Sequence, residues 1–368
     1  MHAINATMMR HNNRTLLLDE IRRQPISRAE LAEMIGLTRA SVTQIVDELI
    51  SEDLVLETAL VGRSRLGRRS TQLALNAKAG YFFGVYLERE QCTIGAMNLL
   101  GEVLCERVEL ISGRTAIQVL DDIAKTISDI RAELQLEDKR IFGVGMCMPG
   151  PVDHRTGRIL NPTNYVAWNQ MPVGEMLAER TGLKIYLENT ADARALEEKY
   201  FFGREEDFVL MGIGESVSLG VIVNGKLYRG SAALPMELGR CPISPDGTRM
   251  LTDVVSVPAL FRETGCSSWA ELYEKASSPA VAEKISMLTK YLTISIVNIL
   301  YAYRMNRVVL VGDVQSCVNQ EHYVERINEN IDRLTSLSAM KNIVISGKQG
   351  NAVRCAASAA YRTMFMLD

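Results

Sequence analysis

Residues 27–52 read SRAELAEMIGLTRASVTQIVDELISE, and this stretch decides how the beginning of the chain folds. Ser27 is placed to cap a first helix, and Glu30, three residues later, completes a capping box. Gly36 ends that helix, and Thr38 begins a second helix whose apolar residues recur at helical spacing. The pattern predicts two short helices joined by a tight turn, as in helix-turn-helix proteins.

A basic loop follows the helix pair. Residues 54–57 and 71–75 are predicted to form two short paired strands, and the segment between them, TALVGRSRLGRRS, contains four arginines and no acid. Guanidinium groups on a flexible loop suit phosphates and the narrow minor groove of DNA, where negative potential is concentrated. The helix pair alone is also compatible with an ordinary helical hairpin in a protein core, but the basic loop favours a winged helix-turn-helix.

Two sets of side chains are then positioned to contact DNA. Residues at the start or on the outer face of the second helix reach base edges or phosphates, and wing residues reach a neighbouring minor groove. The helix set is Thr38, Arg39, Ser41, Thr43 and Gln44, and the wing set is Arg63, Arg65, Arg68 and Arg69. The alternatives are a solvated polar helix face and a disordered loop.

Composition limits the classes of protein to which the chain belongs. Its 368 residues suffice for two or three domains, and the net charge of -3 excludes a protein that coats nucleic acid along its whole surface. The seven cysteines are single, without a CxxC pair, which indicates a reducing cytoplasm and no zinc motif. Without a secretory signal or a long uninterrupted apolar run, we expect a soluble cytoplasmic protein, nucleoid-associated when bound to DNA, with no membrane partner.

The remainder of the chain has the pattern of an α/β protein in two halves. Three strands (81–90, 92–98 and 102–110), a helix (116–134) and a buried strand (141–148) form the first half. The second half repeats strands and helices and contains a long apolar helix, 280–304, suited either to dimer packing or to the core. We expect a DNA-binding domain over 1–76 and a two-lobed α/β domain with a cleft over 80–368.

Five segments carry a family resemblance. They are GVGMCMPGPVD (143–153), NYVAW (164–168), ENTADARALEE (188–198), NGKLYRG (224–230) and ELGR (237–240). In order and spacing they resemble the ROK family of bacterial sugar kinases and sugar-responsive repressors, and the winged helix places the chain with the xylose- and N-acetylglucosamine-repressor-like members. The resemblance implies an actin- and hexokinase-like, ribonuclease H-like fold for the two lobes.

The chain departs from the family's kinase motifs. The general base of the kinases is an Asp, and the matching residue is Thr190, whose hydroxyl cannot accept a proton at neutral pH. Positions matching the glycine-rich phosphate loops and the adenosine site have bulky, polar or acidic side chains: Tyr86, Glu88, Ser216, Ser218 and Asp313. We therefore expect no kinase activity, no catalytic residue and no cofactor.

The family's zinc motif is also missing. Arg240 stands where members usually have a His, and the cysteine cluster that follows it is replaced by PDGTRMLTD. Cys241 stands alone, and we expect it to be a small buried residue. We therefore expect no bound metal.

The resemblance implies that part of the sugar site is kept. Asn164, Asn189 and Glu237 match residues that hydrogen-bond sugar hydroxyls, and Thr190 and Arg240 alter two corners. We expect a small-molecule sugar-like effector with a phosphate or carboxylate that Arg240 holds. The alternative is that Arg240 pairs internally with Glu237 and the cleft binds nothing.

The sequence is thus interpreted as a regulator rather than an enzyme. We expect a transcriptional regulator of carbohydrate-related genes, most simply a repressor, that binds a double-stranded DNA operator as a homodimer or tetramer. The alternatives are a ligand-independent regulator with a vestigial cleft and, with less support, a sugar kinase with unusual loops.

Overall fold

The computed structural model describes residues 6–58, 71–153, 156–160, 168–204, 206–230, 236–313, 320–335, 342–346 and 350–366. The chain divides into two compact units. Unit 1 contains Met1–Met148, Arg155–Glu188 and Asn351–Asp368, and unit 2 contains Pro149–His154 and Asn189–Gly350. The chain therefore enters unit 2 twice, briefly at 149–154 and then over 189–350, and returns to unit 1 each time.

Unit 1 begins with the predicted helix-turn-helix. Ser27 and Glu30 form the expected capping box, and Gly36 ends the first helix of the pair with φ 75°. The strands after the pair are antiparallel, and Ile26 adds a bridge to Leu73. The elements are α1 (Ala6–Arg23), α2 (Arg28–Ile35), α3 (Arg39–Ser51), β1 (Val55–Thr58) and β2 (Gln72–Leu75). The predicted wing arginines lie outside the described residues.

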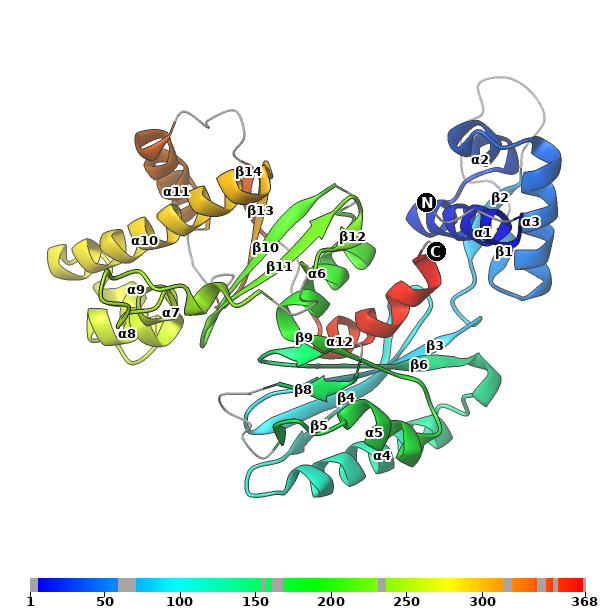
Figure 1. Cartoon of the computed structure of the whole chain (residues 1–368), viewed down its shortest axis with the longest axis horizontal. Helices are drawn as coiled ribbons and strands as arrows, with labels where there is room; N and C mark the ends of the chain where they lie inside the picture. The colour runs from blue at the N-terminus through cyan, green and yellow to red at the C-terminus, as the bar shows by residue number, and fades with distance from the viewer. Residues whose placement is uncertain are drawn as a thin grey trace. The chain divides into compact units, whose positions relative to one another are not determined.

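A five-stranded sheet forms the rest of unit 1 (Figure 1). Its strand order is β5-β4-β3-β6-β9; β3 is antiparallel to β4 and parallel to β6, and β4 is antiparallel to β5. Helix α12 packs on one face, and α4, with α5 beside it, covers the other. The bounds are β3 (Tyr81–Leu87), β4 (Gln91–Asn98), β5 (Val103–Leu110), α4 (Ala116–Glu133), η1 (Asp138–Arg140), β6 (Ile141–Met148), β8 (Arg158–Ile159), α5 (Val173–Thr181), β9 (Ile185–Asn189), α12 (Ala352–Tyr361) and η6 (Arg362–Phe365).

Helix α12 approaches the sheet more closely than side chains would allow. A Cβ atom added to Gly84 would lie 2.0 Å from the carbonyl oxygen of Val353, and one added to Gly145 would lie 2.0 Å from that of Ala356. The backbone of α12 therefore rests directly on β3 and β6, which is possible because both sheet positions are glycine.

Unit 2 repeats the strand order of unit 1. Its sheet is β12-β11-β10-β13-β14, with β10 antiparallel to β11 and parallel to β13. Helices α10 and α11 contribute to the core on one face, and α6 packs on β10 and β11. The bounds are β7 (Val152–Asp153), α6 (Thr190–Phe201), β10 (Phe208–Ile213), β11 (Val217–Val223), β12 (Lys226–Leu227), η3 (Leu238–Arg240), α7 (Thr252–Val255), α8 (Val257–Thr264), α9 (Trp269–Lys275), α10 (Pro279–Tyr303), β13 (Arg307–Gly312), α11 (Gln320–Leu334) and β14 (Asn342–Ile345).

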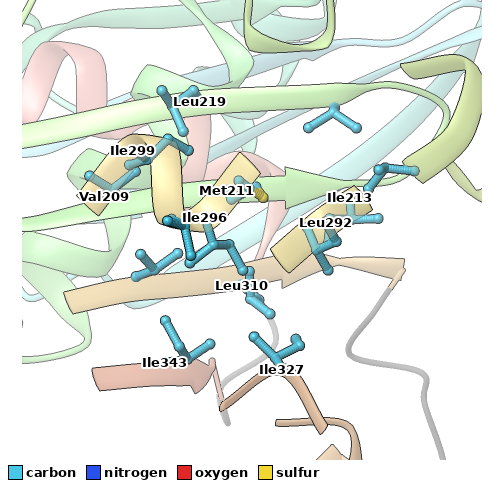
Figure 2. Close-up of a cluster of buried hydrophobic side chains, with 14 of the residues drawn as sticks. Val209, Met211, Ile213, Leu219, Leu292, Ile296, Ile299, Leu310, Ile327 and Ile343 are labelled. Atoms are coloured by element: carbon cyan, nitrogen blue, oxygen red, sulfur yellow. The ribbon is translucent and has the colours of Figure 1, made fainter. Parts of the chain in front are cut away.

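Among the described residues, helix α10 is long and apolar enough to cross a membrane, but half of its apolar segment is buried inside the protein. Leu292 and Ile296 of this helix pack against Met211 and Leu310 of the sheet (Figure 2). Because these side chains fill the space between helix and sheet, α10 is a core helix of unit 2, one of the two roles that the sequence left open.

The structure confirms most predicted elements and corrects some boundaries. Asn224 and Gly225 form the hairpin turn between β11 and β12, with φ values of 50° and 68°. The strand predicted over 81–90 ends at Leu87, as β3. At the end of the described chain, α12 keeps its α form to Tyr361 and continues as the 3₁₀ turn η6.

We predict that Gly145→Ala destabilises unit 1 by about 1–3 kcal/mol, because the new methyl group would overlap the backbone of α12. Thermal and denaturant unfolding of the full chain measure this change. The control is Gly174→Ala in α5, where the added Cβ would meet its nearest neighbour, the Cα of Gly157, at an ordinary 3.4 Å. Equal stability of the two variants would contradict the close packing of α12.

Candidate DNA-binding interface and effector site

Helix α3 is fixed by a cap at its start and by a buried apolar face. The hydroxyl of Thr38 accepts a hydrogen bond from the backbone N–H of Ser41 at 3.2 Å, which satisfies one free donor of the first turn. Val42, Val46 and Leu49 are completely buried. The opposite face of α3 is therefore held outward, as recognition by a helix in a DNA groove requires.

The structure brings the five predicted helix residues together on this outer face. Thr38, Arg39, Thr43 and Gln44 are exposed, whereas Ser41 is half-buried and its hydroxyl lies 2.9 Å from that of Thr38. Thr38 and Ser41 therefore contribute to the cap, and Arg39, Thr43 and Gln44 are the side chains free to reach a base or a phosphate. Their contact with DNA remains a prediction.

Most acidic side chains of α3 are neutralised within the domain. Asp47 accepts a hydrogen bond from Arg28 at 2.7 Å, and Glu52 accepts one from Arg14 of α1 at 2.9 Å. Glu48 pairs with Arg10, also from α1. Arg39 has no carboxylate partner among the described residues, so the exposed end of α3 is positively charged. The sequence signal for the pairs with α1 is the matched spacing of four residues in both helices.

Asn189 has a structural role in addition to any ligand contact. It is 8% exposed and caps α6 by accepting a hydrogen bond from the N–H of Ala191 at 2.8 Å. Its amide nitrogen donates to the carbonyl of Gly150 at 2.7 Å, which ties α6 to the turn after β6. The sequence alone assigned only sugar binding to this residue. Asn164, predicted beside it, lies outside the described residues.

Thr190 follows Asn189 and opens α6. Its hydroxyl is buried and has no hydrogen-bond partner among the described residues. An unsatisfied buried hydroxyl costs about 1–3 kcal/mol of stability. A polar ligand that hydrogen-bonds to Thr190 would therefore not have to break an existing hydrogen bond of this hydroxyl.

Glu237 and Arg240 lie together at η3. The Nε atom of Arg240 is 3.8 Å from Oε2 of Glu237, and the two side chains are 58% and 38% exposed. At this distance and exposure the ion pair is weak. The internal pairing that the sequence left open therefore forms, and more than half of the Arg240 side chain remains exposed to solvent.

The predicted burial of Cys241 was wrong. This cysteine is exposed, because η3 ends at its backbone and the side chain is left at the surface. Across the described ranges, no group of three His, Cys, Asp or Glu side chains is close enough together to hold a metal ion.

The loop that matches a family phosphate site is acidic in unit 2. Asp313 follows β13, and its carboxylate oxygen is 3.4 Å from the position a Cβ of Gly214 would take. Burial raises the pKa of Asp313, and the negative charge of Glu215 raises it further. Two neighbouring carboxylates at this loop disfavour the phosphates of a nucleotide.

Comparison with known proteins supplies a family and a fold. The model of the ROK family matches residues 83–360. The xylose repressor of Caldicellulosiruptor bescii is 30% identical over 244 residues, which are 65% of this chain and 61% of that protein, so the match spans about three fifths of the relative's length.

Two solved structures share the fold. A ROK family transcriptional regulator described as a homologue of the E. coli Mlc protein has a TM-score of 0.81 at 23% identity, over 97% of both chains. The ROK hexokinase of Thermus thermophilus has a TM-score of 0.65 at 23% identity, over 77% of this chain and 98% of its own. At these identities the likeness establishes the two-lobed fold alone.

We predict that Arg39→Ala weakens binding to a duplex selected by the wild-type protein by about 1–3 kcal/mol if the side chain contacts a base. If it contacts a phosphate instead, the loss is uniform across sequences and the salt dependence falls by about one charge. Fluorescence anisotropy at several salt concentrations distinguishes these results. Arg249→Ala, which removes an exposed arginine of unit 2, is the control, and equal affinity of both variants would remove Arg39 from the interface.

Proposed function

The chain belongs to the ROK family, and we propose that it is a sequence-specific transcriptional regulator that represses carbohydrate-related genes and responds to a sugar derivative. The observation that carries this proposal is a capped helix-turn-helix that precedes a ROK domain. On the polar outer face of its second helix, Arg39 has no carboxylate partner among the described residues. The aligned relative is named a xylose repressor, which supports a sugar-related effector.

A regulatory role is better supported than catalysis. The family's kinases use an Asp as general base, and Thr190 cannot take that role because its hydroxyl is not a base at neutral pH. Glu215 adds negative charge in the loop that the resemblance assigns to nucleotide phosphates, and Asp313 adds it at the position assigned to the adenosine. Formation of a sugar phosphate from ATP by the purified protein would contradict this assignment.

The residues of the proposed effector site that the structure describes lie in unit 2. Thr190 supplies an unpartnered hydroxyl, Glu237 an exposed carboxylate that accepts from sugar hydroxyls, and Arg240 a guanidinium for an acidic substituent. Asn189 holds the start of α6 in place. Asn164 is included in the proposed site because of the family resemblance alone. A vestigial site in a ligand-independent regulator is the competing function, supported by the weak pair between Arg240 and Glu237.

Repression at a two-fold operator requires two copies of the helix-turn-helix. We therefore extend the proposal to a homodimer or tetramer in the cytoplasm, bound to double-stranded DNA. Two half-sites need a set distance along the duplex, so an effector that changes the conformation of the ROK domain alters affinity by changing that distance.

Selection of genomic fragments by the purified protein tests DNA recognition. At a salt concentration that suppresses non-specific binding, we expect a recurrent two-fold motif beside transport or catabolic genes, because specific contacts persist when phosphate contacts are screened. Sequencing of the retained fragments provides the readout. Retention that is diffuse and lost with salt, in the presence as well as the absence of candidate effectors, would refute a sequence-specific regulator.

Thermal shift with neutral sugars, sugar acids and sugar phosphates tests the effector. We expect an acidic sugar derivative to raise Tm, and Arg240→Ala to weaken its binding by about 1.5–3 kcal/mol through loss of a charged hydrogen bond. Arg249→Ala should leave the shift unchanged. If no compound of the panel stabilises the protein, the vestigial-site alternative is favoured.

A further inference from the structure

A cavity of about 530 Å³ lies within unit 1, where the helix-turn-helix domain meets the sheet. Its wall combines Arg14 of α1, Arg140 of η1, Tyr186 of β9 and Thr363 of η6. Segments from both ends of the chain and from its middle therefore contribute to one hollow. The volume is within the usual range of about 300–1,000 Å³ for small-molecule sites.

The wall of this junction cavity is predominantly cationic. It has four basic side chains and one carboxylate, Arg14, Lys139, Arg140, Lys184 and Glu52. Arg14 is compensated by Glu52 at 2.9 Å. Lys139 pairs with Glu137 at 2.9 Å, but both side chains are mostly exposed, and such a pair contributes little.

Arg140 and Lys184 keep donors available for a ligand. Arg140 uses Nη1 for the carboxylate of Asp53 at 3.0 Å and the carbonyl of Lys78 at 2.7 Å, whereas its Nε and Nη2 bond to no described residue. The ammonium of Lys184 has no carboxylate partner in the described part of the chain. A planar guanidinium and an ammonium in the wall of one cavity are suited to a phosphate dianion.

We propose that the junction cavity binds a phosphorylated small molecule, with its phosphate on Arg140 and Lys184 and its remainder against Phe142 and Tyr186. The backbone of operator DNA is the less suitable source of the phosphate. Glu52 of the wall follows the thirteen residues of α3, so the cavity is about 20 Å along that helix from its exposed start.

A ligand in this cavity bridges the DNA-binding domain and the sheet. Arg140, on which the phosphate is proposed to sit, also binds the carboxylate of Asp53 at 3.0 Å, and Asp53 directly follows the C-cap of α3. Occupation therefore stabilises one orientation of the DNA-binding helices relative to unit 1. This consequence for DNA rests on the proposed function, whereas binding itself does not.

The test uses the full-length protein, with phenyl phosphate as probe and inorganic phosphate beside it, at constant ionic strength. Phenyl phosphate has a phosphate dianion and a ring but no sugar hydroxyls, so it does not mimic a sugar effector. We expect a Tm rise of a few degrees at about tenfold excess over Kd, and saturable binding by calorimetry without DNA. The proposal would be overturned if neither phenyl phosphate nor inorganic phosphate binds.

Variants locate the probe. Lys184→Gln should weaken phenyl phosphate binding about tenfold, whereas Lys125→Gln, an exposed lysine of α4 outside the cavity wall, should not change it. Arg240→Ala should also leave it unchanged, which separates this site from the effector site. Undiminished binding of phenyl phosphate by Lys184→Gln would overturn the proposal. So would a second result, measured without the probe: a fall of about one charge in the salt dependence of DNA binding by this variant, because Lys184 would then contact a DNA phosphate.

Discussion

The close approach of α12 to the sheet of unit 1 is the constraint on which the rest of this unit depends. Gly84 and Gly145 remove the side chains that would separate the helix from β3 and β6. The chain then continues into η6, where Arg362 forms a buried ion pair with Glu188 at 3.1 Å and Phe365 lies 5.5 Å beneath the guanidinium of Arg22. One contact surface therefore connects the sheet, η6 and the DNA-binding helices.

Local chemistry made much of the fold predictable. The capping box at Ser27 and the stop at Gly36 act over a few residues, so the sequence alone places them correctly. Contacts between distant residues carry no such signal: Arg140 binds Asp53, 87 positions earlier. In the candidate site, the outer face of α3 was predictable from helical periodicity, whereas the hydrogen bond from Asn189 to the carbonyl of Gly150 joins residues 39 positions apart and has no local signal.

The distribution of charge within the DNA-binding helices matters more than the net charge of the chain. With 41 basic and 44 acidic residues, the molecule cannot bind DNA through net charge alone. The acids of α3 instead pair with Arg28 and with the arginines of α1, which leaves Arg39 at the exposed end. The same pairs hold α1 against α3, so neutralising the acids and fixing the orientation of the recognition helix are one physical arrangement.

The position of α12 in the chain has a consequence for biosynthesis. A ribosome completes all five strands of the first sheet, then the whole of 189–350, and only afterwards the helix that covers Gly84 and Gly145. Unit 2 is nearly continuous and is able to fold as it emerges, while one apolar face of the first sheet stays uncovered. The nascent chain is therefore most exposed to aggregation and to chaperones during the synthesis of unit 2.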